Sequence, residues 1–423
     1  MSKSAVVALA ACAAVCAGMV PAQAEPADAA SLAVDEYIVV LHENANAPAL
    51  AQQHVLELGA EVTNVYRTAL KGYSAILSGN AKRRIEADPN VAFVQEDREV
   101  RASAQPSPEG PPAPTAQVTP TGIDRAEADA SPTANIDGAD ERVDVDVAVI
   151  DTGVDLDHPD LNVHQEGAKN CSTLGLTPDD QNGHGSHVAG TVGALDNGDG
   201  VVGMAPGARV WPVKVLNALG VGSTSDVICG IDYVASHADE IEVANMSLGG
   251  AGADDGDCGN TDGDAQHQAI CRAVGAGVTF VVAAGNDSAD AAQSAPAAYD
   301  EVITASALAD FNGRPGGGAP STCREDVDDT FADFSNHGRD VDVIAPGVCI
   351  DSTWMNGGRN TISGTSMASP HVAGAAALHK ANNPGATPEQ VKAALRAAGT
   401  QDWTFPSEDP DGVQEPLLDV TGF

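Results

Sequence analysis

Basic side chains are scarce in this chain of 423 residues. Lysine and arginine total 21 against 60 aspartates and glutamates, which gives a net charge of −39. Proteins that bind nucleic acid need clustered basic side chains to contact phosphates, so this balance argues against that class. The dense negative charge is typical of a protein that stays soluble in high salt or in a calcium-rich exterior, and ordinary solubility of a secreted protein accounts for it nearly as well.

Aromatic residues are also rare, at 4% of the chain, whereas glycine occurs 44 times. This composition indicates small side chains packed closely together, with many tight turns. Hydrophobic residues reach 43%, and the length allows one large or two ordinary domains with a buried core. The cysteines include no C-x-x-C pair, which argues against a structural zinc site.

Long apolar runs are missing after the first 24 residues, which disfavours a membrane-spanning helix. Those 24 residues combine a lysine, a stretch rich in Ala, Val, Leu and Cys, and the sequence Ala-Gln-Ala at 22–24. This pattern predicts a cleaved signal peptide over residues 1–24 and a secreted, extracellular protein. Six cysteines remain after its removal, and an even number in an exported chain predicts three disulfides. They are Cys171, Cys229, Cys258, Cys271, Cys323 and Cys349.

Three segments follow the signal peptide. Residues 25–100 form a first unit, in which apolar runs from residue 35 onward have the order β-α-β-β-α-β, a ferredoxin-like motif. Residues 101–120 are rich in Pro, Ala and Ser without apolar periodicity, which predicts an extended, cleavable linker. From 121 to 423, Val- and Ile-rich strands alternate with helical stretches, which predicts an α/β domain with a doubly wound, mostly parallel sheet.

Four polar side chains stand where this sheet would bind a ligand, at strand ends and helix starts. Asp151 ends an apolar strand, His184 and Ser366 begin helices, and Asn286 follows a strand. Each alone is more often structural, as a helix cap or a turn residue. Together they form a set for acyl transfer: Ser366 as nucleophile, His184 as base, Asp151 as its orienting carboxylate, and Asn286 with the Ser366 N–H as oxyanion donors.

The motifs DTG, HGSHVAG and GTSMASP, in the order Asp, His, Ser, resemble those of subtilisin-like serine peptidases, for which subtilisin is the standard case. The resemblance covers almost all of residues 116–423 and favours the proteinase K-like and bacterial subtilisin branches. The β-α-β-β-α-β unit, including VQED near its end, resembles the family's inhibitory propeptide. No G-x-S-x-G surrounds Ser366, which argues against an α/β-hydrolase.

The resemblance implies which residues bind substrate. One strand would come from NMSLGG and the opposing strand from LNALGVGS, with the peptide added between them. The implied substrate-binding residues are Ser247, Leu248, Gly249, Gly220, Val221 and Gly222, with Ala283, Ala284 and Gly285 walling the main specificity pocket. Small walls favour apolar or aromatic substrate side chains, whereas cleavage after basic residues would require carboxylates there.

The resemblance also implies structural calcium, which fits an oxygen-rich extracellular protein. The implied ligands are Gln117, Asp160, Leu195, Asn197, Asp199 and Val201. Asp199 departs from the apolar residue usual in the family, and a plain acidic turn is the alternative for this loop. AQVTPTGI resembles the start of mature subtilisins, which places the mature N-terminus near residue 116.

The sequence constrains the pairing of the six cysteines less than it constrains the catalytic residues. Cys258 and Cys271 flank one loop with twelve residues between them and are expected to pair. Cys171–Cys229 and Cys323–Cys349 complete the set without a comparable argument.

We therefore predict a secreted serine endopeptidase that cleaves proteins or peptides, is inhibited by its own propeptide and matures by autocatalytic removal of that segment. We expect a monomer that binds neither nucleic acid nor membrane. A non-catalytic, calcium-stabilised binding protein on the same fold is the rival, and it predicts the loss of a triad or oxyanion residue. An intracellular structural protein is a third alternative, which the signal peptide and cysteines oppose.

Overall fold

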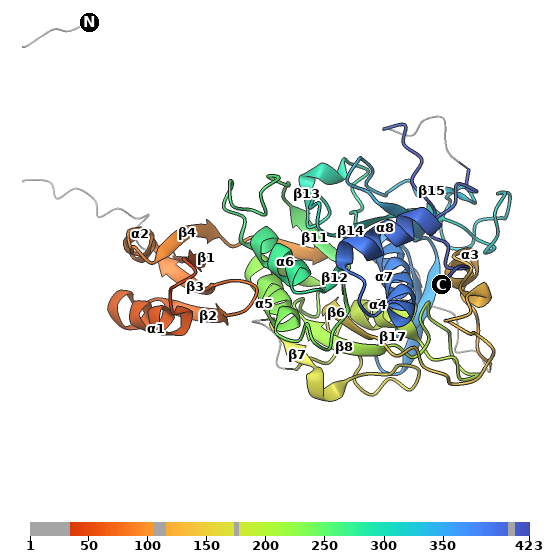
Figure 1. Cartoon of the computed structure of the whole chain (residues 1–423), viewed down its shortest axis with the longest axis horizontal. Coiled ribbons are helices and arrows are strands. Elements are labelled where there is room, and N and C mark those ends of the chain that lie inside the picture. Colours follow the sequence, from red (N-terminus) through yellow and green to blue (C-terminus); the bar gives the residue numbers. More distant parts are fainter. Residues whose placement is uncertain (1–33, 105–115, 173–176, 405–410) are drawn as a thin grey trace, which may run out of the picture.

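The computed structural model describes residues 34–104, 116–172, 177–404 and 411–423. The expected signal peptide and residues 105–115 of the expected linker lie outside these ranges. Within them, no helix combines the length and the apolar character needed to cross a membrane. A small N-terminal unit lies beside a larger α/β unit (Figure 1).

The N-terminal unit has the predicted β-α-β-β-α-β order. Its elements are β1 (Val34–Leu41), α1 (Ala47–Leu58), β2 (Glu61–Tyr66), β3 (Gly72–Ser78), α2 (Gly79–Glu86) and β4 (Val91–Glu96). The strands form an antiparallel sheet in the order β2-β3-β1-β4. Asn46 and Ser78 cap the two helices through side-chain oxygens, as expected for these residue types at helix starts.

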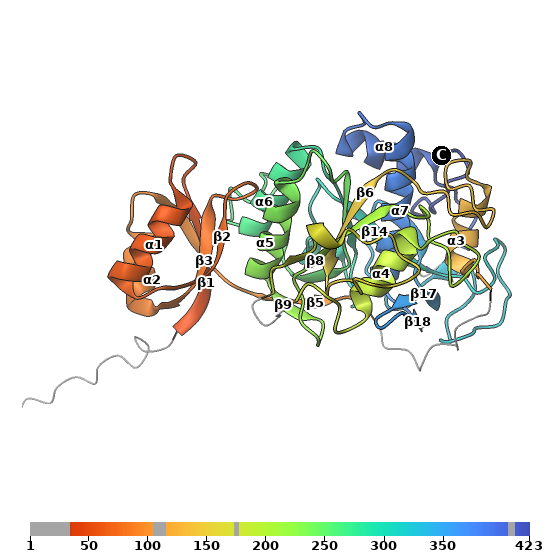
Figure 2. The same ribbon diagram turned by 90° about the horizontal axis from the view of Figure 1, so that it is seen from below.

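The two faces of this small sheet bury different partners. Val39 and Leu41 of β1 pack with Ile85 of α2 in the unit's own core. Ile38 and Val40, which alternate with them, belong to a core shared with helix α5 (Thr224–Ala235). Figure 2 shows the sheet standing against α5 and α6 (Ala265–Gly275). The N-terminal unit is therefore packed on the larger unit through apolar side chains.

The larger unit is built on a mostly parallel sheet, so the predicted fold class is confirmed. Its path has the order β15-β14-β12-β10-β6-β8-β7, and β16 also pairs with β14. The parallel strands are β6 (Asp146–Asp151), β7 (Lys169–Asn170), β8 (Arg209–Lys214), β10 (Val243–Met246), β12 (Thr279–Ala283), β14 (Ile303–Ala309) and β16 (Val343–Pro346). The short β15 (Thr330–Phe331) runs antiparallel to β14.

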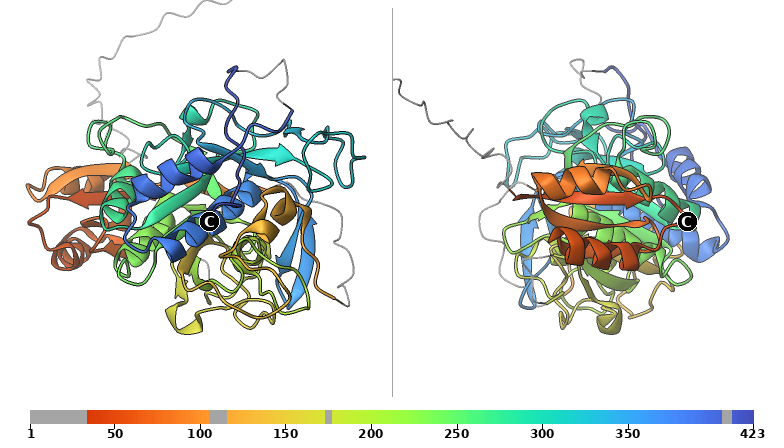
Figure 3. Two further views of the ribbon diagram at one scale, coloured as in Figure 1. Left: turned by 45° about the vertical axis from the view of Figure 1, so that its right-hand side comes forward. Right: turned by 90° about the vertical axis from the view of Figure 1, so that its left-hand side faces the viewer.

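Helices cover both faces of this sheet, as Figure 3 shows. Ala244 and Met246 of β10 face the layer of α5 and α6. Val243 faces the other layer, where Val372 of α7 (Thr365–Asn382) packs. The remaining helices are α4 (His184–Gly193), α8 (Pro388–Ala398) and α3 (Thr121–Arg125), with short 3₁₀ turns η2 (Ala128–Ala130), η3 (Gln165–Gly167) and η4 (Ala291–Gln293). Because strands buried on both faces need apolar residues throughout, the Val- and Ile-rich runs located β6, β8, β10, β12, β14 and β16, whereas the two-residue strands β7 and β15 were not predicted.

A third sheet joins the two units. It has the order β13-β11-β5-β9 and contains β5 (Glu99–Ala102), β9 (Val221–Ser223), β11 (Leu248–Ala251) and β13 (Ser294–Ala295). The predicted boundary between the first unit and the linker, at residues 100 and 101, falls inside β5. Local composition did not reveal this strand because its partners lie more than a hundred residues away. The hairpin of β17 (Ile350–Trp354) and β18 (Gly358–Ile362) was likewise not predicted.

Candidate active site

Asp151 and His184 form a buried pair at the carboxyl edge of the main sheet. Asp151 is the last residue of β6, and His184 is the first residue of α4. His184 Nδ1 donates to Asp151 Oδ1 at 2.8 Å, while His184 Nε2 has no hydrogen-bond partner in the described chain. Burial lowers the pKa of His184, but the charge and hydrogen bond of Asp151, together with the charge of Asp180, outweigh this and raise it above its ordinary value.

Ser366 lies in the first turn of α7, where backbone N–H groups point away from the helix. Its hydroxyl donates to the Ser247 carbonyl at 3.0 Å, and its backbone N–H points to the Ser103 carbonyl oxygen at 3.3 Å. Asn286 Nδ2 donates to that same oxygen at 2.7 Å. The two donors expected for an oxyanion therefore converge on one peptide carbonyl, supplied by the protein's own N-terminal segment.

Thr365 fixes the orientation of Asn286, a role that sequence reasoning missed. The backbone N–H and the hydroxyl of Thr365 donate to Asn286 Oδ1 at 2.9 and 2.8 Å. Since the amide oxygen is held on that side, Nδ2 is turned toward the Ser103 carbonyl. The only sequence signal was position, because Thr365 directly precedes the candidate nucleophile.

Asp180 is a second residue that sequence reasoning missed, and it joins the parts of the chain that carry the Asp–His pair. Its Oδ1 accepts hydrogen bonds from the Thr152 hydroxyl (2.9 Å) and from the N–H groups of Asn182 (2.9 Å) and Gly183 (3.0 Å). Its Oδ2 accepts from the N–H (3.0 Å) and the hydroxyl (2.7 Å) of Ser186. Thr152 follows Asp151, whereas Ser186 stands in the first turn of α4 with His184. A buried carboxylate just before a helix start is favourable because it meets free N–H groups there.

Lys214 supports the same junction from the neighbouring strand. It pairs in register with Asp151 and donates through Nζ to the Thr152 carbonyl. Burial lowers the pKa of Lys214, and the charges of Asp180 and Asp151 oppose that shift. One buried cation thus stands beside two buried carboxylates, which reduces the cost of burying them.

Two neighbouring histidines have packing roles. His187 Nε2 donates to the Ile350 carbonyl at 3.0 Å, and burial lowers the pKa of His187 to about 3. His371 Nδ1 donates to the Met367 carbonyl at 2.7 Å, and burial lowers its pKa to about 4. Both therefore remain neutral at ordinary pH, and neither shares a hydrogen bond with His184.

The strands expected to bind substrate enclose β5. Ala102 N–H donates to the Gly220 carbonyl at 3.0 Å, and Ser103 N–H donates to the Ser247 carbonyl at 3.3 Å. In the antiparallel registers, Val221 and Gly249 both stand opposite Arg101. On the same two strands, the predicted residues Leu248 and Gly222 stand opposite Ala102 and Val100. An extended peptide can thus bind through main-chain hydrogen bonds on both of its edges.

A cavity of about 460 Å³ opens beside Ser103. Ala283, Ala284 and Gly285 line it, together with the exposed carboxylates Asp287 and Asp290. The serine side chain is far too small to fill this volume. The cavity therefore combines small walls with two acidic groups.

Comparison with known proteins identifies this arrangement. The model of the subtilase family, Peptidase_S8, matches residues 143–411. The chain belongs to the subtilase family. A second model, peptidase inhibitor I9, matches residues 36–103, so this subtilase carries an inhibitor propeptide ahead of its catalytic domain.

Individual relatives agree with the family models. An extracellular serine proteinase of Thermus sp. (strain Rt41A) is 37% identical over 387 residues, covering 85% of this chain and 83% of that protein. Subtilisin E of Bacillus subtilis (strain 168) is 35% identical over 370 residues, covering 86% and 85%. A crystal structure of a cold adapted subtilisin-like serine proteinase matches with a TM-score of 0.53 at 34% identity, covering 71% of this chain and 97% of that one. The protein is a serine-type endopeptidase.

The loop expected to bind calcium in this subtilase gathers around Asp160. Asn197 Nδ2 donates to Asp160 Oδ1 at 3.1 Å, and Val201 N–H donates to Oδ2 at 2.9 Å. Burial raises the pKa of Asp160 to about 6, with a further contribution from the charge of Asp199. Two acidic groups at one site, one of them buried, favour a divalent cation with oxygen ligands, so these residues fit calcium.

Gln117 stands at the same loop but uses its side chain differently. Its Oε1 accepts from the N–H groups of Asn197 and Gly198 at 2.9 and 2.8 Å, and its Nε2 donates to Asp196. Leu195 N–H donates to the Asp160 carbonyl at 3.1 Å, which anchors the start of the loop. The Gln117 side chain thus fastens the loop backbone, and its role as a calcium ligand stays a prediction.

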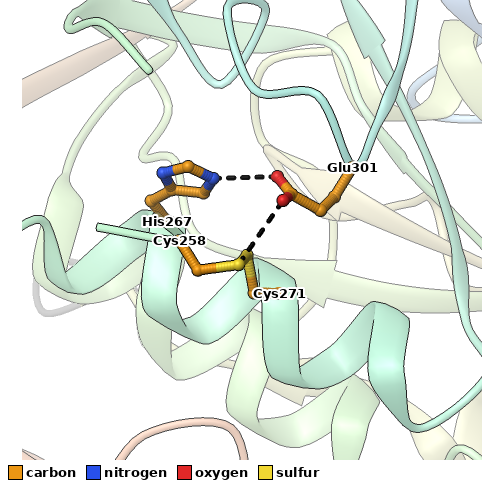
Figure 4. A group of neighbouring side chains, drawn as sticks. All are labelled: Cys258, His267, Cys271 and Glu301. Carbon is orange, nitrogen blue, oxygen red and sulfur yellow. Dashed lines mark hydrogen bonds and ion pairs between the residues drawn. A yellow bond between two sulfur atoms is a disulfide. The ribbon is translucent and has the colours of Figure 1, made fainter. Parts of the chain in front are cut away.

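Three disulfides are present in the structure: Cys171–Cys229, Cys258–Cys271 and Cys323–Cys349. These are the three pairs expected from the sequence. Beside the second, His267 Nε2 donates to Glu301 at 2.8 Å, and Glu301 also approaches the Cys258 sulfur (Figure 4). Because both sulfurs are bonded to each other, neither is a thiolate available to a metal.

Proposed function

We propose that this subtilase is a secreted endopeptidase that hydrolyses proteins through Asp151, His184 and Ser366. The observation that carries the proposal is the Ser103 carbonyl, whose oxygen meets Asn286 Nδ2 at 2.7 Å and Ser366 N at 3.3 Å. A peptide bond bound in this way has its carbonyl polarised by two donors and its carbon presented to Ser366. Developing negative charge on the oxygen is stabilised by the same donors.

The reaction would proceed by acyl transfer. The Ser366 hydroxyl turns from the Ser247 carbonyl to His184 Nε2, which takes its proton as the oxygen attacks the substrate carbonyl. The carbon–nitrogen bond breaks, and the leaving amine takes the proton from His184. Water then hydrolyses the ester with His184 again as base. Asp151 holds the imidazole in the tautomer that has its Nδ1 protonated.

Substrates would bind as an added strand in the place of β5. The cavity beside Ser103 would take the side chain on the acyl side of the cleaved bond. Its small walls suit large apolar or aromatic side chains. A second preference, for basic side chains, is favoured by Asp287 and Asp290 at the same cavity, since each carboxylate can pair with a Lys or Arg side chain.

The remaining elements of the proposal concern the form of the protein. Residues 1–24 would direct secretion, and the propeptide would inhibit the enzyme through β5 until autocatalytic cleavage between residues 101 and 120 releases it. Asp160, Leu195, Asn197, Asp199, Val201 and Gln117 would hold a structural calcium ion, which neutralises their shared negative charge. The enzyme would act as a monomer.

The decisive experiment compares the wild-type protein with Ser366→Ala by intact mass and casein hydrolysis. Wild type should lose its propeptide, digest casein and be blocked by a serine-directed reagent. Ser366→Ala should stay full length after signal removal and lose activity by on the order of a millionfold, as known for subtilisin.

Ser369→Ala is the matched control, because Ser369 lies on the same helix turn but its hydroxyl donates to Asn245 Oδ1. It should mature and remain active. If Ser366→Ala matured and digested casein like wild type, the assignment of Ser366 as the nucleophile would be wrong. A binding protein on this fold would then become the better interpretation.

A further inference from the structure

Residues 99–103 lie extended in the cleft, in the place proposed for the acyl side of a substrate. β5 pairs with β9 on one edge and with β11 on the other. Val100 is buried in the core shared with α5 and α6, so the segment is also anchored by a side chain. Pairing continues through Ser103, whose N–H donates to the Ser247 carbonyl. The register of the segment in the cleft is therefore fixed at several positions.

This register places one peptide bond at the catalytic residues. The Ser103 carbonyl oxygen lies between the two oxyanion donors, so Ser103 supplies the acyl side and Ala104 the leaving amine. The lack of a side chain at Gly364 makes room for this peptide bond. A Cβ atom there would lie 2.5 Å from the Ser103 carbonyl oxygen and 3.1 Å from Ala104 Cα. The backbone at Gly364 thus closely confines both sides of this bond.

We propose that the first bond cut during maturation is Ser103–Ala104, so that the released enzyme keeps residues 104–115 as an N-terminal arm. This inference rests on the proposed function. It differs from the expectation drawn from AQVTPTGI, which placed the mature N-terminus near residue 116. The arm has the sequence AQPSPEGPPAPT.

The residues that follow the alternative bond are held elsewhere. Gln117 N–H donates to the Gly198 carbonyl and Val118 N–H to the Gly200 carbonyl, both at 2.9 Å. Val118 also forms a parallel bridge with Val201. These contacts attach the chain to the expected calcium loop rather than to β9 or β11. The match to the inhibitor model also ends at residue 103.

The cut balances as an ordinary acyl transfer. Ser366 Oγ bonds to the Ser103 carbonyl carbon, the carbon–nitrogen bond to Ala104 breaks, and the serine proton passes through His184 to the Ala104 amine. Water then hydrolyses the ester, which restores the Ser366 hydroxyl and leaves a carboxylate on Ser103. The products are a propeptide ending at Ser103 and an enzyme beginning at Ala104.

The test follows maturation of the full chain over time by intact mass and N-terminal sequencing. Wild type is compared with Ala104→Pro and with the matched control Ala116→Pro. Proline at 104 puts ring carbons on the leaving nitrogen beside Gly364, so the first cut should slow by at least about tenfold. Wild type and Ala116→Pro should both first yield a chain that begins at Ala104.

Folding of Ala104→Pro is checked by adding a trace of mature wild-type enzyme. If the precursor is folded, this enzyme should digest its propeptide, and the variant should then hydrolyse casein. An active wild-type enzyme whose earliest new N-terminus is Ala116, or any residue other than Ala104, would overturn the inference while leaving the proposed function intact. Equal maturation rates for Ala104→Pro and wild type would also overturn it. A wild type without any proteolytic activity would instead refute the proposed function itself.

Discussion

The junction at Asp180 yields the sharpest prediction about catalysis. Asp180→Asn keeps the size of the side chain but removes its charge and one acceptor oxygen. In the variant, the amide nitrogen would take the place of Oδ2. The Thr152 hydroxyl and the N–H groups of Asn182 and Gly183 bind Oδ1 and would keep this acceptor. The Ser186 N–H binds Oδ2 and would lose its acceptor. Losing one hydrogen bond to a charged group, with the donor left buried, costs about 1.5–3 kcal/mol of stability.

The larger effect should be on the Asp151–His184 pair. Asp180 fastens the turn after Asp151 to the start of α4, and displacements of about 1 Å at a catalytic group can cost on the order of 100-fold in rate. We expect kcat to fall between roughly 10-fold and 100-fold, with KM nearly unchanged because the hydrogen bonds of the Asp180 carboxylate in the described chain go to Thr152 and residues 182–186 and not to β5. Removing a negative charge near His184 also lowers its pKa, so the acid limb of kcat/KM should move to lower pH.

The assay is hydrolysis of a peptide anilide across the pH range, normalised by titration of active sites. Asp179→Asn is the control, because this adjacent carboxylate accepts from the Leu156 N–H at 3.2 Å and is not bonded to Thr152 or to α4. It should retain the wild-type kcat and pH profile. The reasoning fails if Asp180→Asn also retains both, or if the two variants lose activity equally with no shift in the acid limb.

Three further predictions concern separate parts of the molecule. Asn286→Ala should reduce kcat by about 10²–10³-fold, the loss known for one oxyanion donor in subtilisin, with little change in KM; an unchanged kcat would contradict the donor role. A calcium chelator should lower the Tm of the wild-type protein by roughly 5 °C or more, whereas Asp160→Asn should be nearly insensitive to it; equal responses in calorimetry would place the ion elsewhere. Replacing both Cys258 and Cys271 by serine should reduce the free energy of unfolding by about 3 kcal/mol in denaturant titration, and a loss near zero would show that the hydrogen bonds and the His267–Glu301 ion pair hold this loop without the disulfide.

Local sequence patterns predicted what depends on neighbours in the chain. Val- and Ile-rich runs located β6, β8, β10, β12, β14 and β16, because strands buried on both faces require apolar residues at every position. Polar residues at the ends of those runs pointed to Asp151 and Asn286. The chemistry of acyl transfer then indicated the roles of these residues, and the family resemblance indicated the strands that bind substrate.

Several features that depend on distant partners were not predicted. β5 has a composition unlike a strand, and its pairing is determined by β9 and β11. Asp180 carries no periodic signal, since its importance lies in bonding Thr152 and Ser186 from two different elements. Asp287 and Asp290 lie beyond the end of β12, so their position at the cavity is evident only in three dimensions.

The apolar contact between the propeptide and α5 has a consequence for when activity appears. Before cleavage, the linkage keeps β5 at the cleft at an effective concentration in the millimolar range, so even a weakly bound segment blocks it. After cleavage the same contact becomes a bimolecular equilibrium, to which Ile38, Val40, Tyr66, Leu70 and Val100 contribute buried apolar surface, whereas the Ser103 side chain fills little of its cavity. Activation would therefore depend on dilution: at high concentration the cut propeptide would rebind, and on dilution it would dissociate and leave the enzyme free.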